Sequence, residues 1–237
     1  MNNTLPTVLC IAGSDSGAGA GIQADLKTIS AMGGYGFCAI SALTAQNSKG
    51  IHHIALTDLN SLDAQIDAVL SDYPIGAVKI GMLGSEGAIE LVAKKLNRID
   101  VPVVIDPVLV STSGTPLLDN SAIGALTGQL FPKALLITPN SNEASYLTGL
   151  EVRSAADVEA AGQKLLELGC STVLIKGGHL SEAEATDYLI TVQSTRPFNA
   201  PREAKHCRMS LGEGSSNTCA DEPRYFRNRL AQVRGDG

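Results

Sequence analysis

The sequence is short of positive charge, of long apolar runs and of paired cysteines. Its 237 residues hold 18 Lys and Arg against 24 Asp and Glu, a formal net charge of −6. This acidic balance argues against a nucleic-acid surface, although a local basic group can still bind a small anion. No apolar run approaches the roughly 18–20 residues that span a bilayer. We therefore predict neither a nucleic-acid partner nor a membrane partner.

Two further absences bear on location and cross-linking. The first residues, MNNTLPTVLCIAG, have no basic stretch before their short apolar run, so we expect no signal peptide and a cytoplasmic protein. The five cysteines are odd in number and include no CxxC pair, which makes disulfides and a zinc site poor expectations. The length suits one large α/β domain with a continuous core.

Short β-branched runs alternate along the chain with segments of helical period. Strands are predicted at 7–13, 36–43, 78–83, 101–108, 134–140 and 171–178. Helical period appears at about 22–32 and again from Leu59 to Val69, and Ser154 with Asp157 forms a capping signature before another helix. Apolar strands separated by helices are typical of a buried parallel sheet. We predict an α/β fold, a mainly parallel sheet with helices on both faces.

The composition changes sharply after residue 201. Residues 202–237 hold six of the nine arginines but only three Leu, Ile or Val residues, and the apolar periodicity stops. The first 201 residues carry a net charge of −8 and the last 36 carry +2. We therefore expect one domain over residues 1–201 and an atypical tail over residues 202–237.

Unusual residues follow the predicted strands, and ligands bind beyond the carboxyl ends of a parallel sheet. The first such segment, GSDSGAGAG, lacks the Gly-Lys-Ser/Thr ending of a phosphate-binding P-loop, and its glycine spacing is not GxGxxG. A tight turn between strand and helix is an equal alternative. We place Asp25 in the first turn of the next helix, where the helix dipole favours a carboxylate, and Gln46 and Asn47 beyond the second strand.

Acidic and basic groups follow the later strands. Asp106 and Glu143, joined by Asn140, could hold Mg²⁺ through water. Ordinary helix capping, with Asn140 or Ser141 starting a helix and Glu143 in its first turn, explains the residues equally well. Lys176, followed by two glycines, suits a phosphate, and a lysine snorkelling from the sheet edge is the alternative.

Seven segments in this order and spacing resemble one family. They are AGSDSGAGAGIQADLKT, ALTAQNSKGI, VKIGML, VVIDPVLVSTSGTPLL, LITPNSNEA, VLIKGGHL and FNAPR. Together they resemble the hydroxymethylpyrimidine/phosphomethylpyrimidine kinases of thiamin biosynthesis, over about Val8 to Arg202. This family has the ribokinase-like three-layer fold, and its pyridoxal kinase branch shares the architecture and some of the motifs.

The resemblance implies transfer of the γ-phosphoryl group of ATP, with Mg²⁺, to 4-amino-5-hydroxymethyl-2-methylpyrimidine and then to its monophosphate. It assigns pyrimidine binding by hydrogen bonds to Gly13, Asp25 and Gln46, and the apolar walls to Met82 and Val108. It places Asp106 and Glu143 at the metal, and Asn140, Lys176 and Gly178 at the nucleotide. Enzymes of this fold often pair, which makes a homodimer an expectation. No catalytic residue is assigned.

The tail departs from the family pattern. Family members carry His-x-x-Gly-Thr-Gly-Cys after the APR segment, opening a helix whose amides hold the transferring phosphate. Here Gly212-Glu213-Gly214 keeps the glycines, but glutamate replaces threonine and no cysteine stands at the motif's spacing. Losing one anion-hole donor typically costs roughly 10²–10³-fold in rate. We expect reduced turnover and hypothesise a frame-shifted or degenerate tail, which reading the neighbouring DNA frames would test.

Two alternatives to the pyrimidine kinase stay open at this point. The first is a pyridoxal kinase on the same scaffold. The second is a catalytically silent protein that keeps the pyrimidine pocket but does not transfer phosphate.

Overall fold

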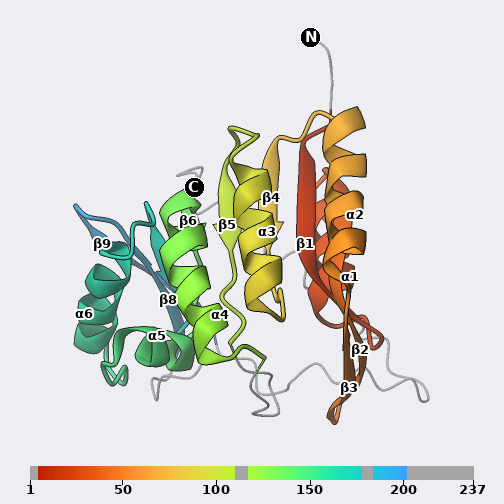
Figure 1. The fold of residues 1–237 in the computed structure, drawn as a ribbon. Helices are drawn as coiled ribbons and strands as arrows, with labels where there is room; N and C mark the ends of the chain where they lie inside the picture. Colours follow the sequence, from red (N-terminus) through yellow and green to blue (C-terminus); the bar gives the residue numbers. More distant parts are fainter. Residues whose placement is uncertain (1–4, 110–116, 178–183, 202–237) are drawn as a thin grey trace.

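The structure is a computed structural model that describes residues 5–109, 117–177 and 184–201. The described strands form one nine-stranded sheet in the order β3-β2-β1-β4-β5-β6-β7-β8-β9 (Figure 1). The strands are β1 Thr7–Asp15, β2 Tyr35–Asn47, β3 Gly50–Leu56, β4 Ala77–Ile80, β5 Val103–Ile105, β6 Leu136–Ile137, β7 Val173–Ile175, β8 Glu184–Ile190 and β9 Thr195–Pro201.

The sheet is mainly parallel, as predicted. The pairs β1–β2, β1–β4, β4–β5, β5–β6 and β6–β7 are parallel, and β3, β8 and β9 add antiparallel pairings at the two edges. The carboxyl ends of the parallel strands therefore meet along one edge of the molecule. Residues that follow different parallel strands can therefore lie close together at this edge, as expected for a ligand-binding site.

All the described α-helices except α1 begin after a side chain that caps them. They are α1 Gly21–Ala31, α2 Leu59–Asp72, α3 Glu86–Leu96, α4 Asn120–Ala125, α5 Ser141–Thr148 and α6 Ala155–Leu166, with a π turn at Leu126–Leu130 and a 3₁₀ turn at Phe131–Lys133. The side chains of Asp58, Ser85, Asp119, Asn140 and Ser154 each accept a hydrogen bond from an amide in the first turn. The capping box predicted for Ser154 and Asp157 is confirmed.

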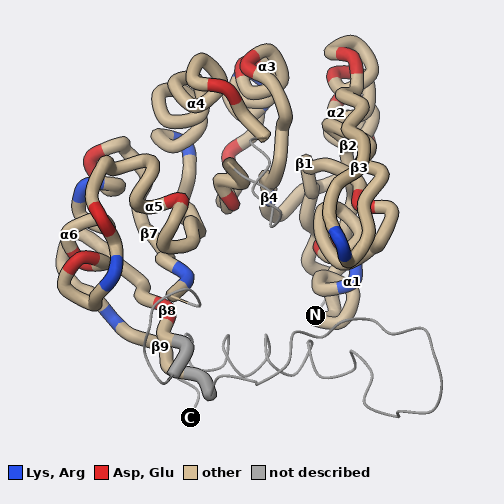
Figure 2. Tube along the Cα trace, turned by 90° about the horizontal axis from the view of Figure 1, so that it is seen from below, with Lys and Arg blue, Asp and Glu red and all other residues tan. Residues whose placement is uncertain are grey.

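Helices cover both faces of the sheet, which confirms the predicted fold class. Viewed from below (Figure 2), α2, α3 and α4 line one side of the sheet and α1 lies on the other, against β1 and β2. Along β4, β5 and β7 burial alternates: Val78, Ile80, Val103, Ile105, Val173 and Ile175 are buried, whereas Lys79, Val104 and Leu174 are only partly buried. The strand side chains on the sheet face that carries α2, α3 and α4 are therefore more fully buried than those on the face that carries α1, among the described residues.

Several predicted boundaries need correction, since β4, β6 and β7 end before the predicted strands do, and three corrections concern residues near the site. The strand predicted over 101–108 is β5, which spans only Val103–Ile105, because the flanking Pro102 and Pro107 have no amide to donate to a ladder. Gln46 and Asn47 lie inside β2 rather than beyond it, since β2 continues to pair with β3. Asp25 is the fifth residue of α1, and the first turn of that helix holds no acid.

No helix in the described part of the chain has the length and hydropathy that a membrane crossing requires. The predicted tail, residues 202–237, lies outside the described residues.

Candidate active site

A cavity of about 750 Å³ opens at the carboxyl ends of the central strands. Eight of the residues selected from the sequence line it: Gly13, Asp25, Gln46, Met82, Asp106, Val108, Asn140 and Glu143. Lys176 does not line the cavity, but its ammonium contacts Asp106, and Asp106 does line it. Gly178 lies outside the described residues. The fold thus brings residues from five separate sequence segments into one cavity.

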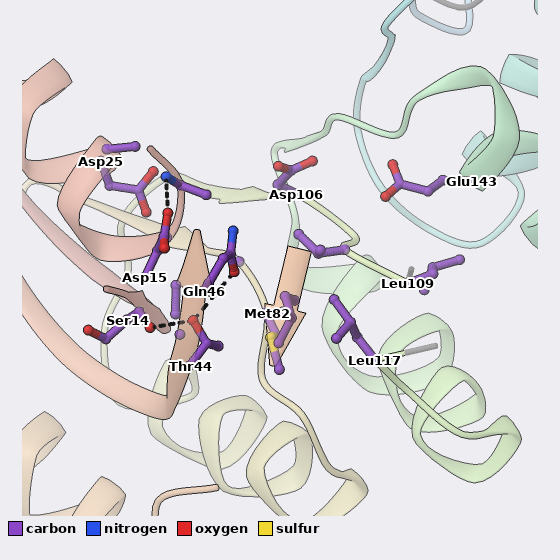
Figure 3. A pocket seen from close by; sticks show the side chains of 18 of the residues that line it. Ser14, Asp15, Asp25, Thr44, Gln46, Met82, Asp106, Leu109, Leu117 and Glu143 are labelled. Atoms are coloured by element: carbon purple, nitrogen blue, oxygen red, sulfur yellow. Dashed lines mark hydrogen bonds between the residues drawn. The ribbon is translucent and has the colours of Figure 1, made fainter. Parts of the chain in front are cut away.

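The labelled side chains fall into two groups (Figure 3). Asp25, Gln46, Thr44 and Ser14 lie on one side of the cavity, which we call the α1 side. Asp106, Glu143, Leu109 and Leu117 lie on the other, the α5 side, with Met82 between the two groups.

The glycine segment after β1 wraps around a carboxylate of its own. Asp15 is 5% exposed, and its side chain accepts hydrogen bonds from the amides of Gly17, Gly19 and Ala20 at 2.7, 2.9 and 2.9 Å. These are the amides that a phosphate would need, and Asp15 already occupies them. The segment is therefore a rigid wall of the cavity rather than a phosphate cradle.

Gly21 allows α1 to start directly over the end of β1. Its φ is +59°, and a Cβ at this position would lie 2.3 Å from the carbonyl oxygen of Gly13. Only glycine fits such a left-handed residue in contact with another backbone. This close approach carries α1, and with it Asp25, to the mouth of the cavity.

Gln46 is held at its backbone and free at its tip. Two hydrogen bonds hold its backbone: the Gln46 N–H donates to Oγ of Ser16 at 2.8 Å, and the Ser16 hydroxyl donates to the Gln46 carbonyl oxygen at 2.8 Å. The side-chain Oε1 has a long 3.4 Å contact with the Thr44 hydroxyl. The carboxamide can therefore turn to a ligand without breaking a strong bond.

Asp25 is paired with a lysine that the sequence analysis did not select. Nζ of Lys79 lies 2.7 Å from Oδ2 of Asp25, and the two side chains are 24% and 18% exposed. Burial raises the pKa of Asp25, and the charge and hydrogen bond of Lys79 oppose that rise. The partner of this carboxylate is thus Lys79 on β4, not the amino end of α1.

On the α5 side, Asp106 follows β5 and receives two donors. Nζ of Lys176 lies 2.8 Å from Oδ1 of Asp106, and the hydroxyl of Thr138 donates to the same oxygen at 3.1 Å. The Lys176 side chain is 39% exposed and that of Asp106 is 30% exposed. This pair faces more solvent than the Asp25–Lys79 pair.

Asn140 and Glu143 form a capping box at the start of α5. The Asn140 side chain accepts from the Glu143 amide at 2.9 Å, and Oε2 of Glu143 accepts from the Asn140 amide at 2.8 Å. Burial raises the pKa of Glu143 to about 7, although the Asn140 amide and the Lys176 charge act to lower it. The capping alternative is therefore realised, and both residues still line the cavity.

The donor set on the α5 side fits one kind of metal site. No cluster of three or more His, Cys, Asp or Glu side chains suited to a metal occurs among the described residues. Mg²⁺, however, is usually bound by one or two carboxylates together with waters and substrate phosphates. Asp106 and Glu143 supply that number of carboxylates.

Sequence reasoning missed two kinds of residue at this cavity. Lys79 interrupts the apolar run VKIGML, and that interruption was a usable signal. Leu109, Leu117 and Tyr146 also line the cavity. Nothing in their local sequence distinguishes them from core or surface residues, because only the packing of α4 and α5 brings them there.

The fold is similar to that of solved kinase structures. The phosphomethylpyrimidine kinase from Clostridium difficile 630 superposes with a TM-score of 0.76 at 41% identity, covering 83% of this chain and 85% of that one. A Bacillus subtilis pyridoxal kinase, solved as an ADP complex, gives a TM-score of 0.77 at 34% identity, covering 85% and 77%. The fold is thus that of small-molecule kinases.

Sequence comparison narrows the class. The model of the phosphomethylpyrimidine kinase family matches residues 15–219. The hydroxymethylpyrimidine/phosphomethylpyrimidine kinase of Escherichia coli is 44% identical over 196 residues, which cover 82% of this chain and 74% of that protein. The Salmonella typhimurium protein of the same name is 46% identical with the same coverage. The chain belongs to the phosphomethylpyrimidine kinase family.

Proposed function

We propose that this protein phosphorylates the hydroxymethyl group of 4-amino-5-hydroxymethyl-2-methylpyrimidine with ATP, and then phosphorylates the monophosphate, in thiamin biosynthesis. The observation that carries the proposal is that one cavity joins two chemically different sides. The α1 side offers a carboxylate, a carboxamide and a thioether, and the α5 side offers two carboxylates beside a lysine. Membership in the kinase family supports the same reading.

The α1 side suits a flat aminopyrimidine. Such a ring carries donors and acceptors around its edge and has two apolar faces, so it needs polar groups in its plane and apolar groups above and below. Asp25 and Gln46 supply the polar groups, Met82 and Val108 the apolar walls. A Cβ at Gly13 would lie 3.5 Å from the Met82 sulfur, so the slot is already narrow there.

The α5 side suits the triphosphate. In the reaction the substrate hydroxyl oxygen forms a bond to the γ-phosphorus, the bond to the ADP oxygen breaks, and the hydroxyl proton is released. Phosphoryl transfer depends mainly on alignment and charge stabilisation. Mg²⁺ bound at Asp106 and Glu143 would neutralise phosphate charge, and Lys176 and Asn140 would orient the phosphates. We assign no catalytic base.

The test is binding and turnover measured together. Calorimetry with the hydroxymethylpyrimidine and a steady-state assay with pyrimidine, ATP and Mg²⁺ should both give a signal. Binding without detectable product would identify a catalytically silent pyrimidine-binding protein. This outcome is worth measuring because Glu213 stands in the tail where the family motif has threonine. Absence of binding would refute the proposed function.

Pyridoxal kinase activity is the second candidate. The structural likeness to pyridoxal kinases from Bacillus subtilis and Staphylococcus aureus, at 34% and 32% identity, favours including it. ATP consumption with the two acceptors side by side ranks the two activities. The cytoplasmic location and the homodimer stay predictions.

A further inference from the structure

Lys79 is a charged residue on an interior strand of the sheet. It lies on β4, in register with Cys10 of β1 on one side and Val104 of β5 on the other. These neighbours supply no countercharge. A lysine that loses hydration needs a charged partner, and the contact of 2.7 Å with Asp25 provides it.

The chain around Lys79 is shaped to bring its ammonium to the cavity. A Cβ at Gly81 would lie 3.0 Å from Cβ of Ala12 and 3.1 Å from Nζ of Lys79. Nζ therefore extends two residues along the strand, toward its carboxyl end, into space that a larger residue at position 81 would fill. Both Lys79 and Asp25 line the cavity.

Asp25 depends on this cation for its charge. Burial is the largest influence on Asp25 and raises its pKa, Lys79 acts to lower it, and Asp106 across the cavity adds to the rise. The third titratable neighbour is the Cys10 thiol, whose pKa burial raises to about 12, so that it stays neutral. Of the charged groups that act on Asp25, Lys79 and Asp106, only Lys79 has the opposite charge.

We propose that Lys79 is a positioning residue, which holds Asp25 ionised and turned into the cavity. Asp25 then accepts a hydrogen bond from the exocyclic amino group of a neutral aminopyrimidine. The proposal rests on the proposed function for the identity of the ligand. Because Lys79 already balances the charge of Asp25, a ligand that binds here needs no positive charge of its own. The pair selects a neutral amino-heterocycle over a cationic one.

A double-mutant cycle tests the proposal on the full-length protein. The dissociation constant of the hydroxymethylpyrimidine is measured by calorimetry at pH 8, without nucleotide, for wild type, Lys79→Met, Asp25→Asn and the double variant. Lys79→Met should weaken binding about 10- to 100-fold, the range for losing a hydrogen bond to a charged group. In the Asp25→Asn background the same substitution should change the dissociation constant by less than about threefold, because coupled residues are non-additive.

Partial unfolding would give a different result. It lowers the number of binding sites per chain and leaves the dissociation constant of the folded fraction unchanged, so both quantities are reported. The matched control is Lys95→Met on α3, where Lys95 contacts Asp63 and Asp67 at 2.7 Å each, outside the cavity wall. This control should lower the melting temperature and leave the pyrimidine affinity unchanged.

A ligand-free measurement separates this proposal from the function on which it rests. The ¹³C shift of the Asp25 carboxyl is titrated by NMR in wild type and Lys79→Met, and the pKa of Asp25 should rise in the variant. An unchanged pKa, an unchanged pyrimidine affinity, or an equal loss in both backgrounds would overturn the role of Lys79. Failure of the wild type to bind the pyrimidine refutes the proposed function, while the NMR titration still decides whether Lys79 controls Asp25.

Discussion

The two sides of the cavity each hold a lysine–aspartate pair, but the pairs are built differently. Lys79 and Asp25 both belong to regular elements, β4 and α1, and their side chains are 24% and 18% exposed. Lys176 and Asp106 both follow the ends of short strands, and their side chains are 39% and 30% exposed. The less exposed pair suits a fixed contact with one rigid ring. The more exposed pair suits an exchange of partners when a highly charged ligand arrives.

The largest expected effect comes from breaking the framework of the α1 side. Gly21→Ala forces a Cβ within 2.3 Å of the Gly13 carbonyl oxygen at a φ of +59°. We expect the free energy of unfolding to fall by about 2–4 kcal/mol and pyrimidine binding to disappear in calorimetry. Gly124→Ala on α4, where a Cβ meets no atom within 4 Å, should instead stabilise by roughly 0.5–1 kcal/mol. Equal stabilities would show that the turn is not strained.

Removing the lysine of the α5 side should affect the nucleotide alone. Lys176→Ala takes away a charged contact for phosphate, and we expect ATP to bind more weakly by about 1.5–3 kcal/mol, measured by equilibrium titration. Pyrimidine affinity should stay within about twofold. The exposed Lys133, which contacts Asn97 outside the cavity wall, offers the matched control Lys133→Ala. The reverse pattern would mean that the two sides are assigned the wrong way round.

Removing the carboxamide of the α1 side should give the complementary result. Gln46→Leu leaves polar atoms of the pyrimidine unpaired and should weaken its binding by roughly 1–3 kcal/mol, with ATP affinity unchanged. Asn47→Leu, the adjacent residue outside the cavity wall, serves as control. Wild-type pyrimidine affinity in Gln46→Leu would remove Gln46 from the site.

The smallest effect concerns the charge of Glu143. Because its pKa is raised to about 7 from 4.5, the folded state keeps a proton that the unfolded chain has released. Its contribution to stability is therefore greatest below pH 4.5 and is lost as the pH rises toward 7. Glu143→Gln keeps an acceptor for the Asn140 amide and avoids this loss. We expect the stability advantage of this variant over wild type to be larger at pH 8 than at pH 5, by about 1–3 kcal/mol.

Urea unfolding in buffer with a chelator measures this difference without any contribution from bound metal. An equal difference at both pH values would show that the effect comes from packing and not from ionisation.

Much of the fold could be predicted because it depends on local signals. Apolar runs located the strands β1, β2, β4, β5, β6 and β7, and capping residues located the start of α6. Strand ends were less predictable: Gln46 reads as a loop residue after an apolar run, and only pairing with β3 keeps it in β2. Asp25 looked like a dipole-stabilised carboxylate, and its real partner, Lys79, is 54 residues away in the sequence.

The sequence by itself determined the alternation of strands and helices, the glycine turn after β1 and the segments that carry the site. These features depend on apolar periodicity, on helix capping and on a glycine with positive φ, which are all properties of neighbouring residues. Only the tertiary structure decided which charges face each other. The pairings Asp25–Lys79 and Asp106–Lys176, and the filling of the glycine amides by Asp15, depend on the strand order and on burial. Electrostatic strength depends on the distance and hydration that packing creates, and no local pattern contains either quantity.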